Sequence, residues 1–485
     1  MSSNSVQLSA RERINYLLDS NSFVEIGANI SKRNTDFNLQ QKDAPSDGVI
    51  TGYGLINNNP VYVYSQDISV LNGTVGEMHA KKIASLYDMA IKVGAPVIGM
   101  IDSKGMRLAE ATDALDAFGS IYMKQITASG IIPQICAVFG TCGGSLAISA
   151  SMNDFTFIAK DNGKLFVSAP NTIDNNYVEK CDTASAEFVA DCGMADFIGE
   201  NDEEVLDKIA QLISFIPANN MDTADLFECD DDLNRICDSL STGIKDSEYI
   251  ISDIADNNDF FEVKKESNRE MVTGFIRLDG MTIGVVANRS EIAATEDAPK
   301  TELGSVLTVG GCEKATSFIK YCDAFEIPVL SITNVTGFDT AKEAQPRMAA
   351  SVAKLISAFA NANVPKINLV TGEAFTSAYI SMNSKHIGAD LVFAWDGAQI
   401  GAMQAKEAVS IIYHDEIEKA DDKQALINEK TELYKFGQNN AMSAAKRGYV
   451  DCIIEPAATR KNLIYGFEML LNKNTDFPYK KHGTI

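Results

Sequence analysis

Two short glycine turns hold the residues whose types and spacing could do chemistry. Residues 102–107 read Asp-Ser-Lys-Gly-Met-Arg, and residues 334–339 read Asn-Val-Thr-Gly-Phe-Asp. Each turn follows a proline-containing apolar run, at residues 95–101 and 327–333, of the kind that forms a buried strand. Both segments therefore place a glycine turn at the end of a predicted strand.

The two turns belong to an internal repeat. Gly105 and Gly337 are 232 residues apart (337 − 105 = 232). The same offset, kept without a gap over some forty residues, places Gly140 on Gly372, Ser145 on Ser377 and the Ile-Pro pair at 132–133 on the Val-Pro pair at 364–365. The chain therefore contains one structural unit twice.

A strand end and a nearby helix N-terminus can direct two free backbone N–H groups at one point, where the helix dipole is also positive. Small residues allow a reacting group to approach the main chain closely. Two such donors make an oxyanion hole, which needs no charged side chain. The candidate donors are Gly105, Met106, Gly144 and Ser145 in the first copy, and Gly337, Phe338, Ser377 and Ala378 in the second. Glycine turns at strand ends are usually only turns, and the repetition favours function.

Side chains offer little other chemistry. The four histidines do not stand in a nucleophile pattern with Ser or Cys, and no phosphate-loop or dinucleotide fingerprint occurs. Cys142 is best interpreted as a small buried hydrophobe. Basic residues near the first turns could meet the phosphates of an anionic ligand or could simply be solvated. They are Lys81, Lys82, Lys104, Arg107 and Lys124.

The elements that must position these turns follow a strand–turn–helix–strand order in each copy, which predicts parallel β-structure with helical crossovers. A hairpin precedes each crossover, with turns at 57–60 and 279–280. Ser9 and Glu12 form a predicted capping box that begins an N-terminal helix. The fold class is therefore α/β, with two similar domains.

The length of 485 residues suits two domains. An acidic, irregular segment at 201–262 suggests a boundary near residue 250, which gives domains of 1–250 and 251–485. Residues 415–435 predict a charged amphipathic helix.

A net charge of −24 argues against nucleic acid or an anionic membrane as partner. The nine cysteines lack C-x-x-C spacing, so neither a zinc site nor a disulfide scaffold is indicated. The N-terminus does not read as a signal peptide. Residues 125–153 carry no charge, but proline and glycines interrupt them, which favours a buried helix–strand–helix passage over a membrane span. We expect a cytoplasmic protein.

The chain resembles the carboxyltransferase subunits of biotin-dependent acyl-CoA carboxylases and decarboxylases. Matching segments run in order through nearly the whole chain. They include Gly-Thr-Val-Gly-Glu-Met-His-Ala-Lys-Lys-Ile at 73–83, Lys-Val-Gly-Ala-Pro-Val-Ile-Gly at 92–99, Ala-Ser-Gly-Ile-Ile-Pro-Gln-Ile at 128–135 and Arg-Gly-Tyr-Val-Asp at 447–451.

This resemblance implies two tandem crotonase-like domains, and a hexamer built as a trimer of dimers with its active site between the N-terminal half of one subunit and the C-terminal half of another. It implies that the oxyanion hole of the N-terminal half binds the acyl-CoA thioester oxygen as an enolate. The oxyanion hole of the C-terminal half would bind the ureido oxygen of biotin. Biotin would arrive on a separate carrier protein, because the chain has no Met-Lys-Met acceptor sequence. Other partners would be a biotin carboxylase or a membrane decarboxylase subunit.

Of the basic residues near the first turn, Lys104 and Arg107 are the predicted contacts of the acyl-CoA. The resemblance adds Ile380, which stands where the family tunes its acyl pocket. The chain has Thr-Ser-Ala at 376–378 in place of the family's Gly-Gly-Ala on the biotin side. Backbone donors survive such side-chain changes, so the holes are expected to persist.

Two other functions stay open. A crotonase-type hydratase or hydrolase would use the first hole alone and needs a carboxylate beside it, for which Glu110 is the nearest candidate. A non-catalytic assembly subunit is the third possibility, and the substitutions at 376–377 are its only support. The direction of carboxyl transfer and the acyl group are not predicted.

Overall fold

The computed structural model describes residues 7–34, 43–174, 182–222, 226–242, 246–294 and 299–473. The chain divides into two compact units, Met1–Ala224 and Asp225–Ile485, here called unit 1 and unit 2. The predicted division near residue 250 falls within helix α8 (Ser247–Ile254). That helix packs its apolar face, Ile250, Ile251 and Ile254, into the core of unit 2.

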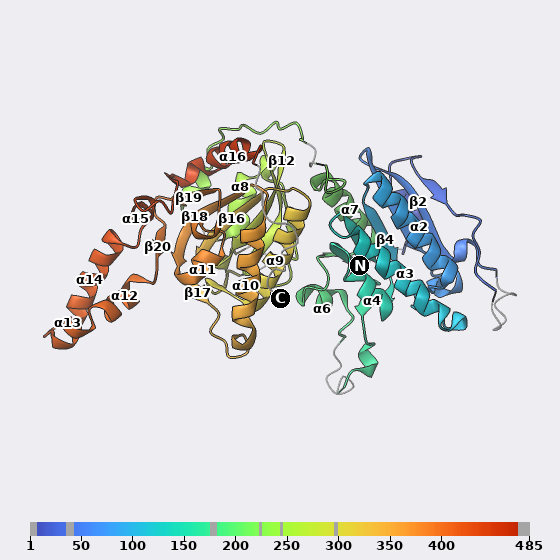
Figure 1. The fold of residues 1–485 in the computed structure, drawn as a ribbon, viewed down its shortest axis with the longest axis horizontal. Helices are drawn as coiled ribbons and strands as arrows, with labels where there is room; N and C mark the ends of the chain where they lie inside the picture. The colour runs from blue at the N-terminus through green and yellow to red at the C-terminus, as the bar shows by residue number, and fades with distance from the viewer. Residues whose placement is uncertain are drawn as a thin grey trace. The chain divides into compact units, whose positions relative to one another are not determined.

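Unit 1 is a mixed sheet covered by helices (Figure 1). Its strand order is β1-β2-β3-β4-β5-β7-β9, with a small parallel pair β6–β8 beside it. The strands are β1 (Val24–Ile26), β2 (Val49–Ile56), β3 (Asn59–Gln66), β4 (Val97–Ile101), β5 (Gln134–Val138), β6 (Thr141–Gly143), β7 (Phe155–Ala159), β8 (Lys164–Phe166) and β9 (Phe197–Gly199). The helices are α1 (Ala10–Leu17), α2 (Glu77–Val93), α3 (Asp113–Ala128), α4 (Ser145–Ala150), α6 (Ala186–Asp191) and α7 (Asp202–Phe215).

Unit 2 repeats this sheet with the order β10-β11-β12-β16-β18-β19-β21, and β20 also pairs with β18. The strands are β10 (Phe260–Val263), β11 (Met271–Leu278), β12 (Met281–Asn288), β13 (Glu291–Ile292), β14 (Thr301–Glu302), β15 (Val306–Leu307), β16 (Val329–Val335), β17 (Gly337–Phe338), β18 (Lys366–Phe375), β19 (Leu391–Trp395), β20 (Gln399–Gly401) and β21 (Cys452–Ile454). The helices after α8 are α9 (Val309–Ala324), α10 (Gln345–Asn361), α11 (Thr376–Ser381), α12 (Ala405–Ile412), α13 (His414–Lys419), α14 (Lys423–Gly437), α15 (Ala441–Ala445) and α16 (Thr459–Leu470).

The two sheets share one pairing scheme. In each, the first three strands are antiparallel and the remaining neighbours are parallel. Val97 pairs with Tyr62 in unit 1 as Val329 pairs with Gly284 in unit 2. Parallel neighbours need crossover connections, which α2, α3, α9 and α10 supply. The predicted duplication and the α/β class are therefore confirmed.

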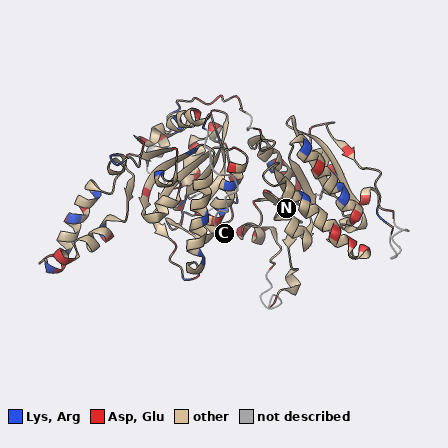
Figure 2. Ribbon diagram, viewed as in Figure 1, with Lys and Arg blue, Asp and Glu red and all other residues tan. Residues whose placement is uncertain are grey.

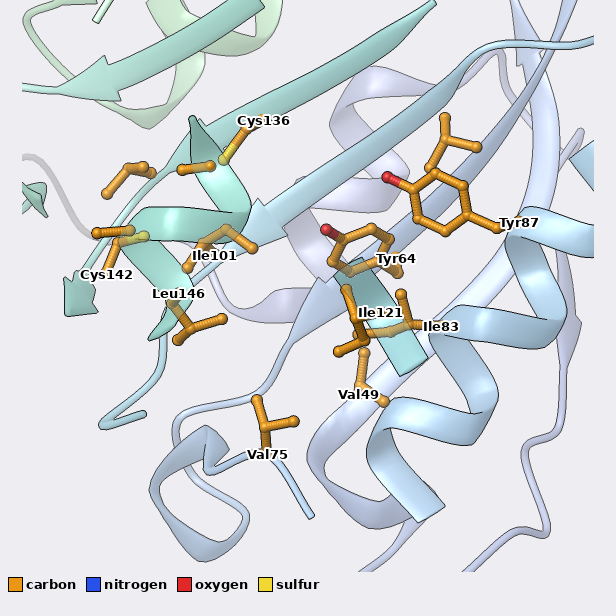
Figure 3. Packing of buried hydrophobic residues seen from close by; sticks show 14 of the residues in the cluster. Val49, Tyr64, Val75, Ile83, Tyr87, Ile101, Ile121, Cys136, Cys142 and Leu146 are labelled. Atoms are coloured by element: carbon orange, nitrogen blue, oxygen red, sulfur yellow. The ribbon is translucent and has the colours of Figure 1, made fainter. Parts of the chain in front are cut away.

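The core of unit 1 lies between its sheet and the helices α2 and α3 (Figure 3). Tyr64 of β3, Ile83 of α2 and Ile121 of α3 meet there, all with exposed fractions below a tenth. Cys142 is fully buried next to the same core, and burial raises the pKa of its thiol well above the usual value. The interpretation of Cys142 as a small buried hydrophobe is confirmed.

Several local predictions hold. The predicted hairpins are β2–β3 and β11–β12, and Asn57 and Asn58 both have positive φ, as the tight connection requires. The N-terminal helix α1 has the predicted capping box at Ser9. Residues 125–153 run from α3 through β5 and β6 to α4, and most of them are buried or half-buried, although Ile126 and Ile148 are exposed.

Two expectations were wrong. The acidic stretch from residue 201 is not irregular throughout, because α7 buries an apolar stripe that includes Val205, Ile209 and Leu212. The charged helix predicted at 415–435 is two helices, α13 and α14, since Asp422 caps the start of α14 with its side chain. Both helices lie with α12 in the part of unit 2 that extends away from its sheet, where charges of both signs are visible (Figure 2).

Candidate active site

The first candidate donor lies just after β4. Met106 forms an isolated parallel bridge with Val75. The N–H of Val75 donates to the carbonyl of Gly105, and the N–H of Arg107 donates to the carbonyl of Val75, both at 2.9 Å. Because alternate residues bond to the neighbouring strand in a parallel pair, the N–H of Met106 faces away from Val75. Among the described residues it has no hydrogen-bond partner.

The second candidate donor lies at the start of α4. Gly144 has a φ of 59° and donates its own N–H to the carbonyl of Phe166 at 2.9 Å. Ser145 begins the helix, where backbone N–H groups lack an intrahelical acceptor. Within the described part of the chain its N–H has no partner. Tyr122 donates its hydroxyl to the carbonyl of Ser145 at 2.7 Å, which holds this turn in place.

The two turns of unit 1 adjoin. The N–H of Ser103 donates to the carbonyl of Thr141 at 3.0 Å. A Cβ added to Gly105 would lie 3.9 Å from the carbonyl oxygen of Gly143, and one added to Gly144 would meet nothing within 4 Å. The free amides of unit 1 therefore belong to neighbouring loops with open space beside their glycines.

Unit 2 repeats the first donor at the same offset. Leu307 pairs with Phe338 in the short parallel pair β15–β17, 232 residues after the pairing of Val75 with Met106. The N–H of Asp339 donates to the carbonyl of Leu307 at 2.9 Å. The N–H of Phe338 therefore faces away from β15, as the N–H of Met106 faces away from its partner.

The second donor of unit 2 lies at the start of α11. Thr376 has a φ of 62°, matching the 59° of Gly144, although a β-branched residue rarely adopts this conformation. Its hydroxyl accepts the N–H of Ala378 at 3.2 Å. The N–H of Ser377 is left without a partner among the described residues.

One amide of each predicted pair is thus free, and in three of the four pairs the neighbouring amide donates to a known acceptor. Gly105 donates to the hydroxyl of Ser103 at 3.0 Å, and Gly337 lies within the β15–β17 pair. The free amides are those of Met106, Ser145, Phe338 and Ser377. The engaged ones are those of Gly105, Gly144 and Ala378.

The structure gives Arg107 a different place from the predicted contact with ligand phosphates. Its side chain is 4% exposed and its Nη1 bonds to Asp47 at 2.6 Å and to Glu110 at 3.0 Å. Its Nη2 donates to the carbonyl of Thr74 at 2.6 Å. Lys104 is exposed beside the first turn, with its Nζ 3.5 Å from the hydroxyl of Thr141.

The other basic residues predicted near the first turn lie in different environments. Lys82 is buried and donates to the carbonyls of Ser46 and Val49, and burial lowers its pKa to about 8. Lys124 pairs with Asp88. Lys81 is exposed. Lys82 therefore has a structural position and cannot face a ligand.

Glu110 is not available as the free carboxylate that a hydratase would need. It is 3% exposed. One of its oxygens accepts the N–H of Glu77 at 2.6 Å and the other meets Arg107. A base must reach the substrate proton through a free oxygen, so this arrangement speaks against the hydratase alternative.

Ile380 lines a cavity of about 660 Å³ in unit 2 that also contains Ser377. The rings of His386 and Tyr449 pack against each other in its wall, tilted by 31° with centroids 4.5 Å apart, and burial lowers the pKa of His386. Further lining residues are Thr376, Tyr379, Ile400, Met403, Tyr434, Gln438, Asn439 and Arg447. The sequence pattern gave no signal for His386 or Tyr449.

Sequence reasoning also missed a buried ion cluster behind the first turn. Arg13 of α1 bonds to Asp202 at 3.0 Å and to Asp102 at 3.4 Å, and Gln7 donates to Asp102 at 3.2 Å. Burial raises the pKa of both carboxyls, although Arg13 opposes the shift. The repeat offset could have pointed to this cluster, because it places the neutral Asn334 of unit 2 where unit 1 has the charged Asp102.

The other two histidines within the described ranges are His79 and His414. His79 is fully buried between Gln66 and the carbonyl of Asp47, and burial lowers its pKa to about 3. His414 is exposed, and His482 lies outside the described residues. Across the described ranges no group of three or more His, Cys, Asp or Glu side chains is placed to hold a metal ion. None of the helices described there is long and apolar enough to cross a membrane.

Comparison with known proteins places the chain. Residues 4–485 match the carboxyl transferase domain family. The chain is 37% identical to the methylmalonyl-CoA decarboxylase subunit alpha of Propionigenium modestum (99% of this chain, 93% of the relative). It is 38% identical to the propionyl-CoA carboxylase beta chain of Roseobacter denitrificans (99% and 94%).

A solved structure gives the same answer for the fold. The chain superimposes on transcarboxylase 12S, a hexamer solved with methylmalonyl-CoA bound, with a TM-score of 0.91 and 33% identity over 98% of this chain and 92% of that one. The tandem crotonase-like fold expected from the resemblance is thereby confirmed. The chain belongs to the carboxyl transferase domain family, as the carboxyltransferase subunit of a biotin-dependent acyl-CoA carboxylase or decarboxylase.

Proposed function

We propose that the chain moves a carboxyl group between biotin, held on a separate carrier protein, and the α-carbon of a short acyl-CoA. The observation that carries this proposal is the repetition of free backbone amides. Unit 1 presents the N–H groups of Met106 and Ser145, and unit 2 presents those of Phe338 and Ser377, each 232 residues later. A reaction with one oxyanion on each substrate needs two such sites.

The acyl-CoA side falls to unit 1. When the α-carbon loses a proton or a carboxyl group, the electron pair of the broken bond moves toward the thioester oxygen. The N–H groups of Met106 and Ser145 would hold that oxygen as it gains negative charge, with Lys104 exposed beside the turn for the CoA phosphates. Arg107 is engaged within the protein and is left out of this role.

The biotin side falls to unit 2. The cavity beside Ser377 is lined largely by apolar and aromatic side chains, which suits a bicyclic ring, and Ile380 lies in its wall. As the carboxyl leaves N1′ of biotin, charge builds on the ureido oxygen, which the N–H groups of Phe338 and Ser377 would stabilise. Thr376 also lines this cavity, at the position that Gly144 holds in unit 1.

The names of the relatives support a choice of substrate. They include a methylmalonyl-CoA decarboxylase and propionyl-CoA carboxylases, which share the propionyl and methylmalonyl acyl groups. We infer that this chain uses the same pair of thioesters. Its partners would be a biotin carrier protein, with either a biotin carboxylase or a membrane decarboxylase subunit. Like transcarboxylase 12S, it would assemble as a hexamer.

The test is decarboxylation by the purified chain. Malonyl-CoA or methylmalonyl-CoA is incubated with and without free biotin, and the release of CO₂ is followed. Biotin-dependent release is expected. Turnover that ignores biotin would support a hydrolase of the crotonase type, and CoA binding without turnover would support an assembly subunit.

A further inference from the structure

We propose that Arg107 is a positioning residue for the acyl-CoA oxyanion hole, and that it holds the N–H of Met106 in place by clamping the bridge between Met106 and Val75. This inference rests on the proposed function. Arg107 follows Met106 directly, and its own N–H closes that bridge onto the carbonyl of Val75. Its guanidinium then returns to the other side of the bridge, to Thr74.

The clamp is made of five hydrogen bonds from one side chain. Nη2 donates to the carbonyl of Thr74 at 2.6 Å and to the carbonyl of Asp47 at 3.5 Å, while Nε donates to the hydroxyl of Thr74 at 3.3 Å. Nη1 bonds to the carboxylates of Asp47 at 2.6 Å and Glu110 at 3.0 Å. A planar guanidinium can serve such a set of acceptors, whereas a lysine ammonium cannot.

The acceptors are themselves fixed. Asp47 is fully buried and its second oxygen accepts the N–H of His79 at 2.8 Å. Glu110 accepts the N–H of Glu77 at 2.6 Å. Both carboxylates therefore cap the N-terminus of α2, so the clamp ties the Met106 bridge to a crossover helix of seventeen residues.

Unit 2 shows what replaces the clamp. At the same offset Arg107 becomes Asp339, which is half-buried, and Glu110 becomes Lys342, which is exposed. In unit 2, backbone hydrogen bonds hold the corresponding donor in place. Phe338 belongs to a ladder of two residue pairs, β15–β17, and the N–H of Thr336 donates to the carbonyl of Ser305 at 2.7 Å. Met106 has a single isolated bridge, so its orientation depends on the neighbouring side chain.

The test compares Arg107→Lys and Glu110→Gln with Arg460→Lys as a matched control. Arg460 is also fully buried and bonds to Asp256 at 2.7 Å and to the carbonyl of Ile254 at 2.7 Å, but it contacts none of the four free amides. Each variant is assayed for biotin-dependent decarboxylation of malonyl-CoA, for KM, and for thermal unfolding. If Arg107→Lys does not fold, the kcat of Glu110→Gln still tests the proposal.

Misplacing a catalytic donor by about 1 Å costs about a hundredfold in rate. We expect kcat to fall about tenfold to a hundredfold in Arg107→Lys and Glu110→Gln, with KM for malonyl-CoA within about threefold of wild type. The double variant should lose no more than the worse single one, because both loosen one clamp. Arg460→Lys should lower the unfolding temperature and leave kcat unchanged.

Two results would overturn the inference. One is an unchanged kcat in a folded Arg107→Lys or Glu110→Gln protein, and the other is an equal loss of kcat in Arg460→Lys. Absence of biotin-dependent activity in the wild-type chain would instead remove the proposed function itself, so the two failures can be told apart.

Discussion

Thr376 shows at the scale of one residue how the second copy has departed from the first. It stands where unit 1 has Gly144, with nearly the same positive φ, and a strained residue of this kind costs about 1–3 kcal/mol. The hydrogen bond from the N–H of Ala378 to the hydroxyl of Thr376 offsets part of that strain energy. The result is that Ser377, and not Ala378, presents its amide.

Replacing Thr376 by Asn should therefore stabilise the protein. Asn tolerates positive φ better than a β-branched residue, and its side-chain oxygen can still accept an N–H two residues on. We expect Thr376→Asn to raise the free energy of unfolding by about 1 kcal/mol in urea titrations. Thr376→Gly should gain less, because it loses the acceptor. A lower midpoint for Thr376→Asn would show that the φ of this residue is not strained.

Asp102 gives a second prediction at this scale. Its counterpart Asn334 accepts the N–H of Glu373 at 3.0 Å, and among the described residues no arginine bonds to it. Asp102→Asn should cost less than about 1 kcal/mol, because Arg13 keeps one carboxylate partner in Asp202. Arg13→Met should cost about 3–5 kcal/mol, because it leaves two buried carboxylates unpaired.

The pH dependence of Arg13→Met checks the cause. Burial already raises the pKa of Asp102 and Asp202 in the folded protein, so without Arg13 the folded state binds more protons than the unfolded state above the usual carboxyl pKa. Stability of Arg13→Met should then recover as the pH falls toward that value. Chemical denaturation between pH 7 and 5 measures this, and a variant that keeps losing stability on acidification contradicts it.

At the scale of elements, the crossover helices α2 and α9 each carry a buried lysine at the repeat offset. Lys82 donates to the carbonyls of Ser46 and Val49, and Lys314 donates to those of Lys264 at 2.8 Å and Ser267 at 2.9 Å. Burial lowers both pKa values to about 8. Each lysine thus ties its helix to the loop that precedes the hairpin.

This pairing predicts an alkaline signature. Between pH 8 and the usual lysine pKa of 10.5, the unfolded chain binds more protons than the folded one, so the contribution of Lys82 to stability rises with pH. The free-energy difference between wild type and Lys82→Met should grow in favour of wild type over that range. Urea titrations at pH 7.5 and 9.5 measure it, and a difference that shrinks would mean that Lys82 is not buried as a charged group.

Many helices, strands and turns could be predicted from the sequence, because the patterns that specify them are local or occur twice. The hairpin turns, the capping box at Ser9 and the offset of 232 all lie in short patterns. The clamp on Arg107 and the pairing of Arg13 with Asp202 were not predictable, since their partners lie 60 and 189 residues away. From the sequence alone, a charged residue beside a glycine turn is easily interpreted as a ligand contact, because its buried hydrogen-bond acceptors are not visible.

At the scale of the whole molecule, the proposed function divides the chemistry between the two units of the duplication. Both keep the free amides, but unit 1 braces its first turn with buried ion clusters and unit 2 with backbone pairing. The acyl-CoA and biotin sites should therefore fail independently.

Proline substitution can separate them, because it removes one N–H and is tolerated in the first turn of a helix. Ser145→Pro should lower kcat with little change in KM for free biotin. Ser377→Pro should lower the rate and raise KM for free biotin, while KM for malonyl-CoA stays within about threefold. Steady-state kinetics with each substrate varied in turn decide this. Identical effects of the two variants on both substrates would contradict a division of labour.

The most direct test removes the central donor alone. Replacing the backbone amide of Met106 by an ester, through incorporation of the α-hydroxy analogue of methionine, deletes the N–H and keeps the side chain. It also makes the carbonyl of Gly105, which accepts the N–H of Val75, a weaker acceptor. Loss of one oxyanion donor should lower kcat for biotin-dependent decarboxylation of malonyl-CoA by about a hundredfold to a thousandfold, with KM nearly unchanged. A kcat within about twofold of wild type would contradict the claim that main-chain amides hold the enolate.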